Sequence, residues 1–231
     1  MFTSMATLHS LKPKPPPNVL IYTPFTFTIN VTSSTPNVTG TASNYPITFN
    51  PNPNTSNTYG NITNFSKTTI QNKNITIYVK GRIPIVNTAV NKCLYSFGKD
   101  YSTANDWVHI GISSTAPSRI NYIYREGASI VYDGVTSSII LANATYFHTF
   151  VVFNVSTSKV QLFVYSNTSV LLFTLAPTTY TPAIIFQNFV NYNLARDKFG
   201  TCYNTTIGLA GYYNAALSST QMLNVVNQSP N

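Results

Sequence analysis

Hydrophobic and polar residues alternate along much of the chain with a period of two. Such a period places successive side chains on opposite faces of a β-strand. The clearest case is the stretch 146–169, where two alternating runs flank a group of turn-forming residues, 154–158. It predicts a β-hairpin in which one face carries Phe147, Thr149, Val151, Phe153, Val160, Leu162 and Val164, and the other carries His148, Phe150, Val152, Gln161, Phe163 and Tyr165.

Short segments of the same kind recur at regular intervals, separated by Gly, Pro, Asn and Ser. Pro24 interrupts the first of them, which predicts an edge strand or a break between two short strands. Glu126-Gly127 and Asp133-Gly134 are predicted to be turns. So many short strands indicate a sandwich or a barrel. The expected strands are Val19–Val31, Ile75–Lys80, Cys93–Phe97, Trp107–Ile112, Ile120–Arg125, Ala128–Tyr132, Ser138–Leu141, Val170–Leu175, Ala183–Phe189 and Thr205–Tyr213.

One short helix is predicted near the C-terminus. Ser218 followed three residues later by Gln221 forms the sequence of a capping box, and Leu217 and Met222 occupy the two positions of a hydrophobic staple. We expect the helix to cover residues 219–226, with Leu223 and Val226 facing the sheet.

The N-terminal part differs in composition from the rest. Residues 12–17 contain four prolines, which favour an extended, polyproline-like arm. Residues 32–61 are dense in Asn, Pro, Thr and Ser, and are expected to form a surface loop or the seam between the arm and the main domain. We therefore divide the chain into residues 1–44, an arm and polar extension with a candidate edge strand, and residues 45–231, a β-sandwich.

The composition agrees with an all-β fold and limits the classes of function. Only 8% of the 231 residues are charged, and the net charge of +8 arises from five acidic residues against 13 scattered basic ones. No recognisable nucleic-acid-binding motif accompanies the basic residues, so we expect a solvated basic surface that can help contact with an acidic partner.

Targeting signals are not recognisable in the sequence. No stretch reaches the roughly 18 apolar residues of a membrane span, and the N-terminus lacks the basic and apolar regions of a signal peptide. Asn-x-Ser/Thr sequons are frequent, and in a chain so rich in these residue types we interpret most of them as polar turns.

The order of the predicted elements resembles that of the laminin-G-like domains in the concanavalin-A-like lectin/glucanase superfamily. Five segments carry the resemblance, and the last of them, with the pattern Tyr-Asn-x-x-Leu-Ser, is the most specific. The segments are Thr76–Gly81, Leu94–Gly98, Tyr146–Asn154, Val160–Ser166 and Gly211–Gln221. The resemblance implies an antiparallel two-sheet jelly roll over roughly residues 45–227. Tyr146, Asn154, Ser166 and Gln221 depart from the family pattern, which weakens any transfer of its ligand chemistry.

Catalysis is not expected. The glycoside hydrolases of this superfamily need paired carboxylates on one strand, whereas Glu126 is the single Glu and stands at a predicted turn. His109 and His148 lie on predicted strands, where we expect packed structural residues rather than bases. Cys93 and Cys202 match no zinc or redox motif; they can pair as a disulfide or remain two separate buried thiols.

Two kinds of ligand contact remain open. Calcium requires six to eight oxygen ligands, and Asp100, Asp106, Asp133 and Asp197 are the acidic candidates, with backbone carbonyls supplying the rest. We expect no cofactor other than this calcium. Exposed aromatic rings can stack on sugars, and the candidates for glycan contact are Trp107, Tyr122, Tyr124 and Tyr132; the alternative is that these rings fill or cover the sandwich.

Two functions are therefore predicted. The first is a non-catalytic structural protein, a capsid or surface component of a virus particle that contacts neighbouring protein subunits. It rests on the missing active site, the proline-rich arm and the low-charge polar surface. The alternative is a carbohydrate-binding, lectin-like module for attachment to a cell surface. The structural protein would be located on the virion, and the carbohydrate-binding module would be extracellular or at the cell surface.

Overall fold

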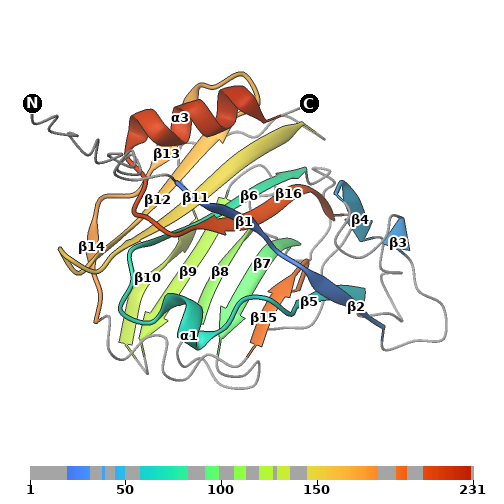
Figure 1. The fold of residues 1–231 in the computed structure, drawn as a ribbon, viewed down its shortest axis with the longest axis horizontal. Helices are drawn as coiled ribbons and strands as arrows, with labels where there is room; N and C mark the ends of the chain where they lie inside the picture. Colours follow the sequence, from blue (N-terminus) through green and yellow to red (C-terminus); the bar gives the residue numbers. More distant parts are fainter. Residues whose placement is uncertain are drawn as a thin grey trace, which may run out of the picture.

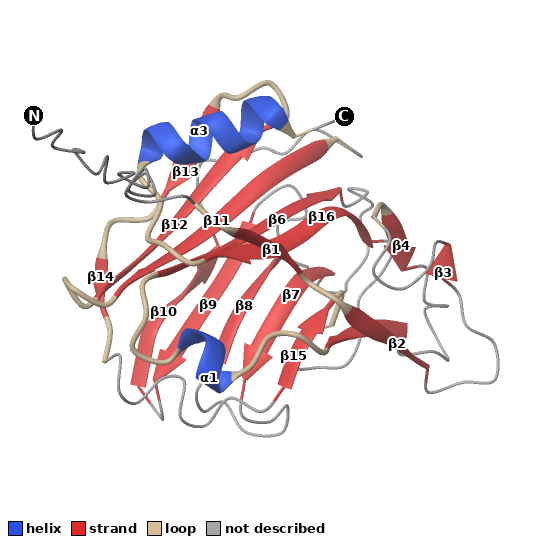
Figure 2. Ribbon diagram, viewed as in Figure 1, coloured by secondary structure: helices blue, strands red, loops and turns tan. Residues whose placement is uncertain are grey.

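The computed structural model consists of two antiparallel β-sheets packed face to face, with one helix against the outer face of the first sheet (Figures 1 and 2). This confirms the all-β, two-sheet sandwich predicted from the sequence. The structure describes residues 20–31, 38–39, 45–49, 58–82, 92–98, 107–112, 120–126, 129–135, 145–181, 191–196 and 205–229. Neither described helix is long and apolar enough to cross a membrane.

The first sheet, sheet A, is 9-stranded and has the order β13-β12-β11-β6-β16-β4-β3, with β1 paired to β16 and β14 paired to β12. Its strands are β1 (Tyr22–Pro24), β3 (Val38–Thr39), β4 (Ile47–Phe49), β6 (Ile75–Arg82), β11 (Tyr146–Asn154), β12 (Lys159–Ser166), β13 (Leu171–Thr174), β14 (Thr178–Thr179) and β16 (Thr205–Tyr213).

The second sheet, sheet B, is 7-stranded and has the order β10-β9-β8-β7-β15-β5-β2. Its strands are β2 (Phe27–Val31), β5 (Thr58–Ile62), β7 (Lys92–Gly98), β8 (Trp107–Ile112), β9 (Ile120–Glu126), β10 (Ser129–Val135) and β15 (Asn191–Leu194).

The predicted hairpin is the pair β11–β12, and its two faces are as expected. Val151 lies opposite Leu162 on β12 and opposite Ile77 on β6, and these side chains face sheet B. The other face, with Phe150 and Val152, is also buried, because the C-terminal helix covers it. The centre of sheet A is therefore buried on both faces, and nearly every residue of β6 and β11 is buried.

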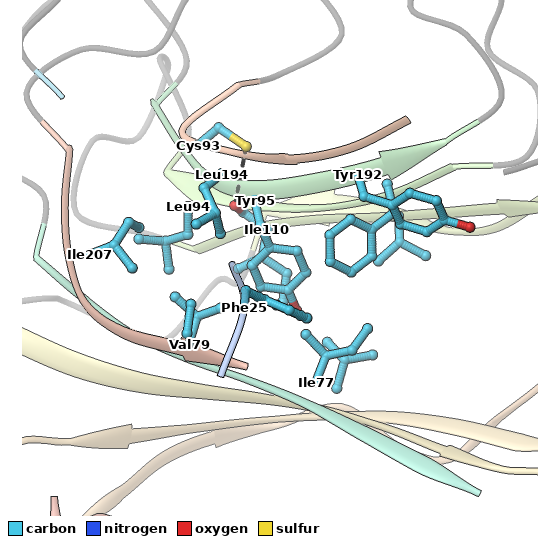
Figure 3. Close-up of a cluster of buried hydrophobic side chains, with 14 of the residues drawn as sticks. Phe25, Ile77, Val79, Cys93, Leu94, Tyr95, Ile110, Tyr192, Leu194 and Ile207 are labelled. Carbon is cyan, nitrogen blue, oxygen red and sulfur yellow. Dashed lines mark hydrogen bonds between the residues drawn. The ribbon is translucent and has the colours of Figure 1, made fainter. Parts of the chain in front are cut away.

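The core between the sheets is shown in Figure 3. Val79 and Ile207 of sheet A are buried in the same cluster as Leu94, Tyr95 and other residues of sheet B. At this spacing a small residue is required at Gly81, because a Cβ there would overlap the Leu94 side chain. The packing of large rings and branched residues is what joins the two sheets.

Pro24 marks a change of sheet. β1 ends at Pro24 and pairs with β16 in sheet A, whereas β2 begins at Phe27 and pairs with β5 in sheet B. Between them Phe25 is fully buried and its N–H donates to the carbonyl of Ala210 at 2.9 Å. The predicted break between two strands is confirmed, and these strands, from the part of the chain before residue 45, belong to the sandwich.

The C-terminal helix, α3 (Ser219–Gln228), begins at the predicted capping box. Gln221 N–H donates to Ser218 Oγ at 3.3 Å, and Ser218 N–H donates to Gln221 Oε1 at 2.8 Å. Leu217 and Met222 are buried, as expected for a staple. The prediction that Leu223 faces the sheet was wrong: it is 36% exposed, and Met222 together with Val226 forms the contact face.

Several other elements differ from the prediction. Asp133 and Gly134 lie within β10, opposite Ile123 and Tyr122, so they are not a turn; pairing with β9 continues through them. The strands β5, β14 and β15 and the short helix α1 (Lys67–Ile70) were not predicted, because each is short and contains Asn or Thr rather than a continuous apolar pattern. The strands expected at Ser138–Leu141 and Ala183–Phe189 and the proline-rich arm lie outside the described residues.

We predict that the M222A variant unfolds at clearly lower denaturant concentration. Met222 is fully buried on the face of α3 that packs against sheet A, so truncation removes packing worth about 2–5 kcal/mol. Leu223→Ala, one residue away and exposed, should cost less than about 1 kcal/mol. Urea unfolding of both variants checks this; equal losses would show that α3 does not dock by the Met222 face.

A second prediction concerns Gly211 of β16, which stands opposite Pro24 in the antiparallel pair of β1 and β16. A Cβ at this position would overlap the backbone carbonyl of Thr23 and the Tyr22 ring, so Gly211→Ala should cost about 1–3 kcal/mol. Gly208→Ala is the control, because the only close neighbours of its Cβ are side-chain atoms of Tyr146 and Lys80, which can shift. A loss for Gly208→Ala as large as that for Gly211→Ala, measured by thermal unfolding, would contradict the account.

Candidate functional site

The first candidate site is a hollow of about 510 Å³ at one end of the sandwich, which we call the α1 pocket. It lies between β1, helix α1, the start of β6 and the end of β16 (Figure 1). Its lining combines one aromatic ring, amides, hydroxyls and an ammonium group: Ile21, Thr23, Thr69, Lys73, Asn74, Ile75, Tyr212 and Asn214.

An aromatic cluster holds the floor of the α1 pocket in place. Tyr212 stacks on Phe25, with ring centroids 6.0 Å apart, and lies 5.0 Å from Phe65. Phe65 in turn packs on Phe97 and Tyr192 of sheet B. Because Tyr212 is half-buried in this cluster, its ring is fixed before any ligand binds.

Asn64 fastens the segment that leads into α1. Its Oδ1 accepts from Thr26 N–H at 2.9 Å, and its Nδ2 donates to the Pro24 carbonyl at 2.8 Å. The loop before α1 is thus tied to the chain crossing between β1 and β2. From the sequence Asn64 could be seen only as one sequon among many, and its role as a clasp was missed.

The α1 pocket is rich in hydrogen-bond donors. The Asn74 and Asn214 side chains use Oδ1 to accept from the backbone N–H groups of Val155 (2.8 Å) and Ile21 (3.1 Å). Their Nδ2 groups make no hydrogen bond within the described part of the chain. Lys73 donates once, to the Thr68 carbonyl at 3.3 Å, which leaves two of its three N–H donors.

A second hollow, of about 520 Å³, lies on the outer face of sheet A between the β11–β12 hairpin and the start of α3. We call it the hairpin pocket. Its floor is apolar and its rim is polar, and the lining residues are Val152, Asn154, Thr157, Lys159, Gln161, Phe163, Pro177, Ala216, Leu217 and Ser218.

The rim of the hairpin pocket repeats the chemistry of the α1 pocket. Asn154 Oδ1 accepts from Thr157 N–H at 3.2 Å, and its Nδ2 makes no hydrogen bond to a described residue. Lys159 donates once, to Thr179 Oγ1 at 2.6 Å. Each pocket therefore pairs a lysine with an asparagine whose oxygen is occupied and whose NH₂ group is available.

Both pockets suit a polar ligand with many acceptor atoms. None of the described side chains is a carboxylate: the side chains of Glu126 and Asp133, and residues Asp100, Asp106 and Asp197, lie outside the described set. The described residues also include no group of three or more His, Cys, Asp or Glu that could hold a metal ion. Calcium binding stays a prediction, since its acidic candidates are not described.

A buried polar chain joins sheet A to the end of α3. His148 Nδ1 lies 2.9 Å from Tyr78 Oη, which lies 2.8 Å from Ser229 Oγ, and Ser229 Oγ lies 2.8 Å from the Val225 carbonyl oxygen. A carbonyl can only accept, so Ser229 donates to it, Tyr78 donates to Ser229, and His148 Nδ1–H donates to Tyr78. The prediction that His148 is a packed structural residue is confirmed by its full burial.

Burial lowers the pKa of His148 to about 4; the positive charge of Lys80 acts in the same direction, and a hydrogen bond with Asn167 opposes them. The unfolded state therefore takes up a proton near pH 6.5, while the folded state stays neutral down to about pH 4. Stability contributed by neutral His148 is present above pH 6.5 and is lost as the pH falls toward 4.

We predict that the free energy of unfolding decreases by up to about 1.4 kcal/mol per pH unit in this window. His148→Asn keeps an N–H donor for Tyr78 and does not titrate, so it should flatten the dependence. Thr149→Ser, at the next residue of β11 and equally buried, is the control: it changes no titrating group and should leave the slope of the wild-type chain. An unchanged slope in His148→Asn, measured by urea unfolding at several pH values, would contradict the assignment.

The aromatic candidates for glycan contact all lie on sheet B, away from both pockets. Tyr122 is fully buried in the core between the sheets, so its ring offers no face to a sugar. Tyr124 and Tyr132 stand opposite each other on β9 and β10, and Trp107 begins β8. The side chains of these three residues are outside the described set, and their role stays a prediction.

Cys93 is fully buried on β7. Its Sγ lies 3.0 Å from the Arg196 carbonyl oxygen and 3.3 Å from Nδ1 of His109, which is also buried, as predicted. Cys202 lies outside the described residues, so the choice between a disulfide and two thiols stays open.

The residues that line the two pockets were not among those predicted. Asn74 could be seen only as a sequon, Asn154 as a turn residue that departs from the family pattern, and Asn214 as part of the closing Tyr-Asn pattern. A usable signal exists in retrospect: in each pocket a lysine stands within five residues of an asparagine at a strand end, as in Lys73-Asn74 and Asn154…Lys159.

The sequence matches no family model, and no curated protein matches it. Solved structures do match. The binding domain of botulinum neurotoxin DC, solved in complex with rat synaptotagmin II, aligns with a TM-score of 0.62 and 14% identity over 88% of this chain and 47% of that one. A structure described as showing that cell entry of botulinum neurotoxin type C depends on two ganglioside molecules gives 0.60 and 13%, over 89% and 47%.

A smaller domain also matches. The CBM40 domain of the Ruminococcus gnavus IT-sialidase, bound to α2,3-sialyllactose, aligns with a TM-score of 0.50 and 14% identity over 69% of this chain and 84% of that one. The likeness is one of fold. At these identities it shows a shared two-sheet β-sandwich, and the laminin-G-like assignment stays a prediction. The chain spans about half the length of the toxin structures that it matches.

Proposed function

We propose that this chain is a non-catalytic carbohydrate-binding module that attaches to glycans at a cell surface or in the extracellular space. The observation that carries the proposal is the α1 pocket, where a fixed Tyr212 ring lies beside the NH₂ groups of Asn74 and Asn214 and the ammonium group of Lys73. Sugars present apolar C–H faces and many oxygen acceptors, and a site for them combines a ring with directed donors.

The similar structures support this choice over the other predicted function. Two of them are described by what they bind, a sialylated sugar in one case and gangliosides in the other. None of the structures reported above is a virus particle subunit, so a capsid role has no support of this kind. The carbohydrate-binding alternative is the better-supported of the two.

The experiment that tests the proposal is a glycan array followed by calorimetry on the glycans that bind. Lys73→Ala should reduce affinity about tenfold, because it removes a charged donor from the α1 pocket. Lys67→Ala is the matched control: it removes an exposed lysine of helix α1, shortly before Lys73 in the chain, that does not line the pocket.

Two results would overturn the proposal. One is the absence of saturable binding to any glycan on the array. The other is equal affinity of Lys73→Ala and Lys67→Ala for a glycan that does bind, since the α1 pocket would then not be its site.

A further inference from the structure

We propose that the α1 pocket and the hairpin pocket are two subsites of one binding surface, and that its ligand is an acidic oligosaccharide that occupies both. This inference rests on the proposed carbohydrate-binding function and makes it more specific. It concerns the length and the charge of the ligand, which the fold alone does not indicate.

The two pockets lie at the same end of sheet A. Phe153 of β11 pairs with Ile75 of β6, and Thr76 of β6 pairs with Tyr213 of β16, so the residues that follow these strand ends are neighbours. In Figure 1 the tip of the β11–β12 hairpin and the start of α3 both lie on the left of the view.

The pockets also share a wall. The segment 214–218 contributes Asn214 to the α1 pocket and Ala216, Leu217 and Ser218 to the hairpin pocket. Thr76, fully buried, fixes this segment: its hydroxyl donates to the Ala215 carbonyl at 2.7 Å and accepts from Leu217 N–H at 3.0 Å. One rigid strip of chain therefore sets the separation of the two subsites.

Val155 and Ala215 come between lining residues of the two pockets. Val155 directly follows Asn154 of the hairpin pocket and donates its N–H to Asn74 of the α1 pocket, and Ala215 lies inside the shared segment 214–218. Both side chains are short and half-buried. We therefore infer that the ridge between the pockets is low and that an extended ligand passes over it. A single sugar fills one subsite, whereas a chain of sugars reaches both.

The charge of the surface indicates an acidic ligand. Each subsite has one lysine with two N–H donors remaining, Lys73 in one and Lys159 in the other. A carboxylate or sulfate group accepts charge-assisted hydrogen bonds, which are stronger than those of a neutral hydroxyl. The net charge of +8 acts in the same direction over longer range.

The test uses an array of sialylated, uronic-acid-containing and sulfated oligosaccharides, from monosaccharides upward, beside their uncharged parents. We expect acidic members to bind more tightly than their parents, and affinity to rise when a second and third sugar is added. Higher salt should weaken the acidic members selectively. Calorimetry then measures the variants on the acidic oligosaccharide that binds best.

Two variants locate the subsites, and each has its own control. Lys159→Ala should lower affinity for the acidic oligosaccharide about tenfold, whereas Thr179→Val, which removes only the hydrogen-bond partner of Lys159, should keep it. Val155→Trp raises the ridge and should abolish the gain in affinity with chain length. Val170→Trp is its control, since Val170 is 56% exposed and lines neither pocket.

The failures are distinguishable. If no glycan binds, the proposed function fails. If glycans bind through Lys73 but uncharged parents bind equally well, or Lys159→Ala and Val155→Trp leave binding unchanged, the proposed function stands and the two-subsite inference is overturned. Thermal unfolding of each variant confirms that it is folded, and Thr157→Ala on the hairpin-pocket rim gives a second, milder test of the same subsite.

Discussion

The hydrogen bonds of Thr76 determine the geometry on which the rest of the structure depends. This hydroxyl is fully buried at the start of β6, the central strand of sheet A, and it holds both the Ala215 carbonyl and the Leu217 N–H. Through these contacts the segment after β16 is fixed against the sheet, and Ser218 is placed as the N-cap of α3. A buried hydroxyl that both donates and accepts a hydrogen bond stabilises the fold, and the loss of either partner would lower the free energy of unfolding.

Two consequences follow from this anchoring. The outer face of sheet A can be apolar, because α3 is held across it and Met222 and Val226 cover Phe150 and its neighbours. The same segment, Asn214 to Ser218, then forms the wall between the two pockets. The interaction that closes the fold is thus also the one that places the polar donors, and the binding surface is as rigid as the sandwich beneath it.

The sequence predicted the fold better than the site, and the reason is physical. Alternation in β11 and β12 and the capping box of α3 are local signals, and the structure follows them closely. Burial of β11 on both faces is also consistent with its sequence, since large apolar residues lie on both faces of the strand. By contrast, the prediction that Leu223 faces the sheet was wrong. One turn of the helix carries several apolar residues, and the way α3 packs on sheet A determines that Met222 is the buried one. β5 and β15 have polar sequences and form strands because their neighbours in sheet B pair with them.

The pockets could not be predicted because they are assembled from segments far apart in the chain. Ile21 and Asn214, which are far apart in the chain, make two hydrogen bonds: Ile21 N–H donates to Asn214 Oδ1, and Asn214 N–H donates to the Ile21 carbonyl. In the same way, the Val155 N–H donates to Asn74 Oδ1. Whether an asparagine presents its oxygen or its NH₂ group depends on these long-range partners.

The most direct measurement of the central claim is an NMR titration of the side-chain NH₂ resonances with an acidic oligosaccharide. The account predicts that the Asn74, Asn154 and Asn214 signals shift together and saturate at one concentration of sugar. Shifts confined to sheet B, or saturable binding that leaves these three signals unmoved, would contradict it.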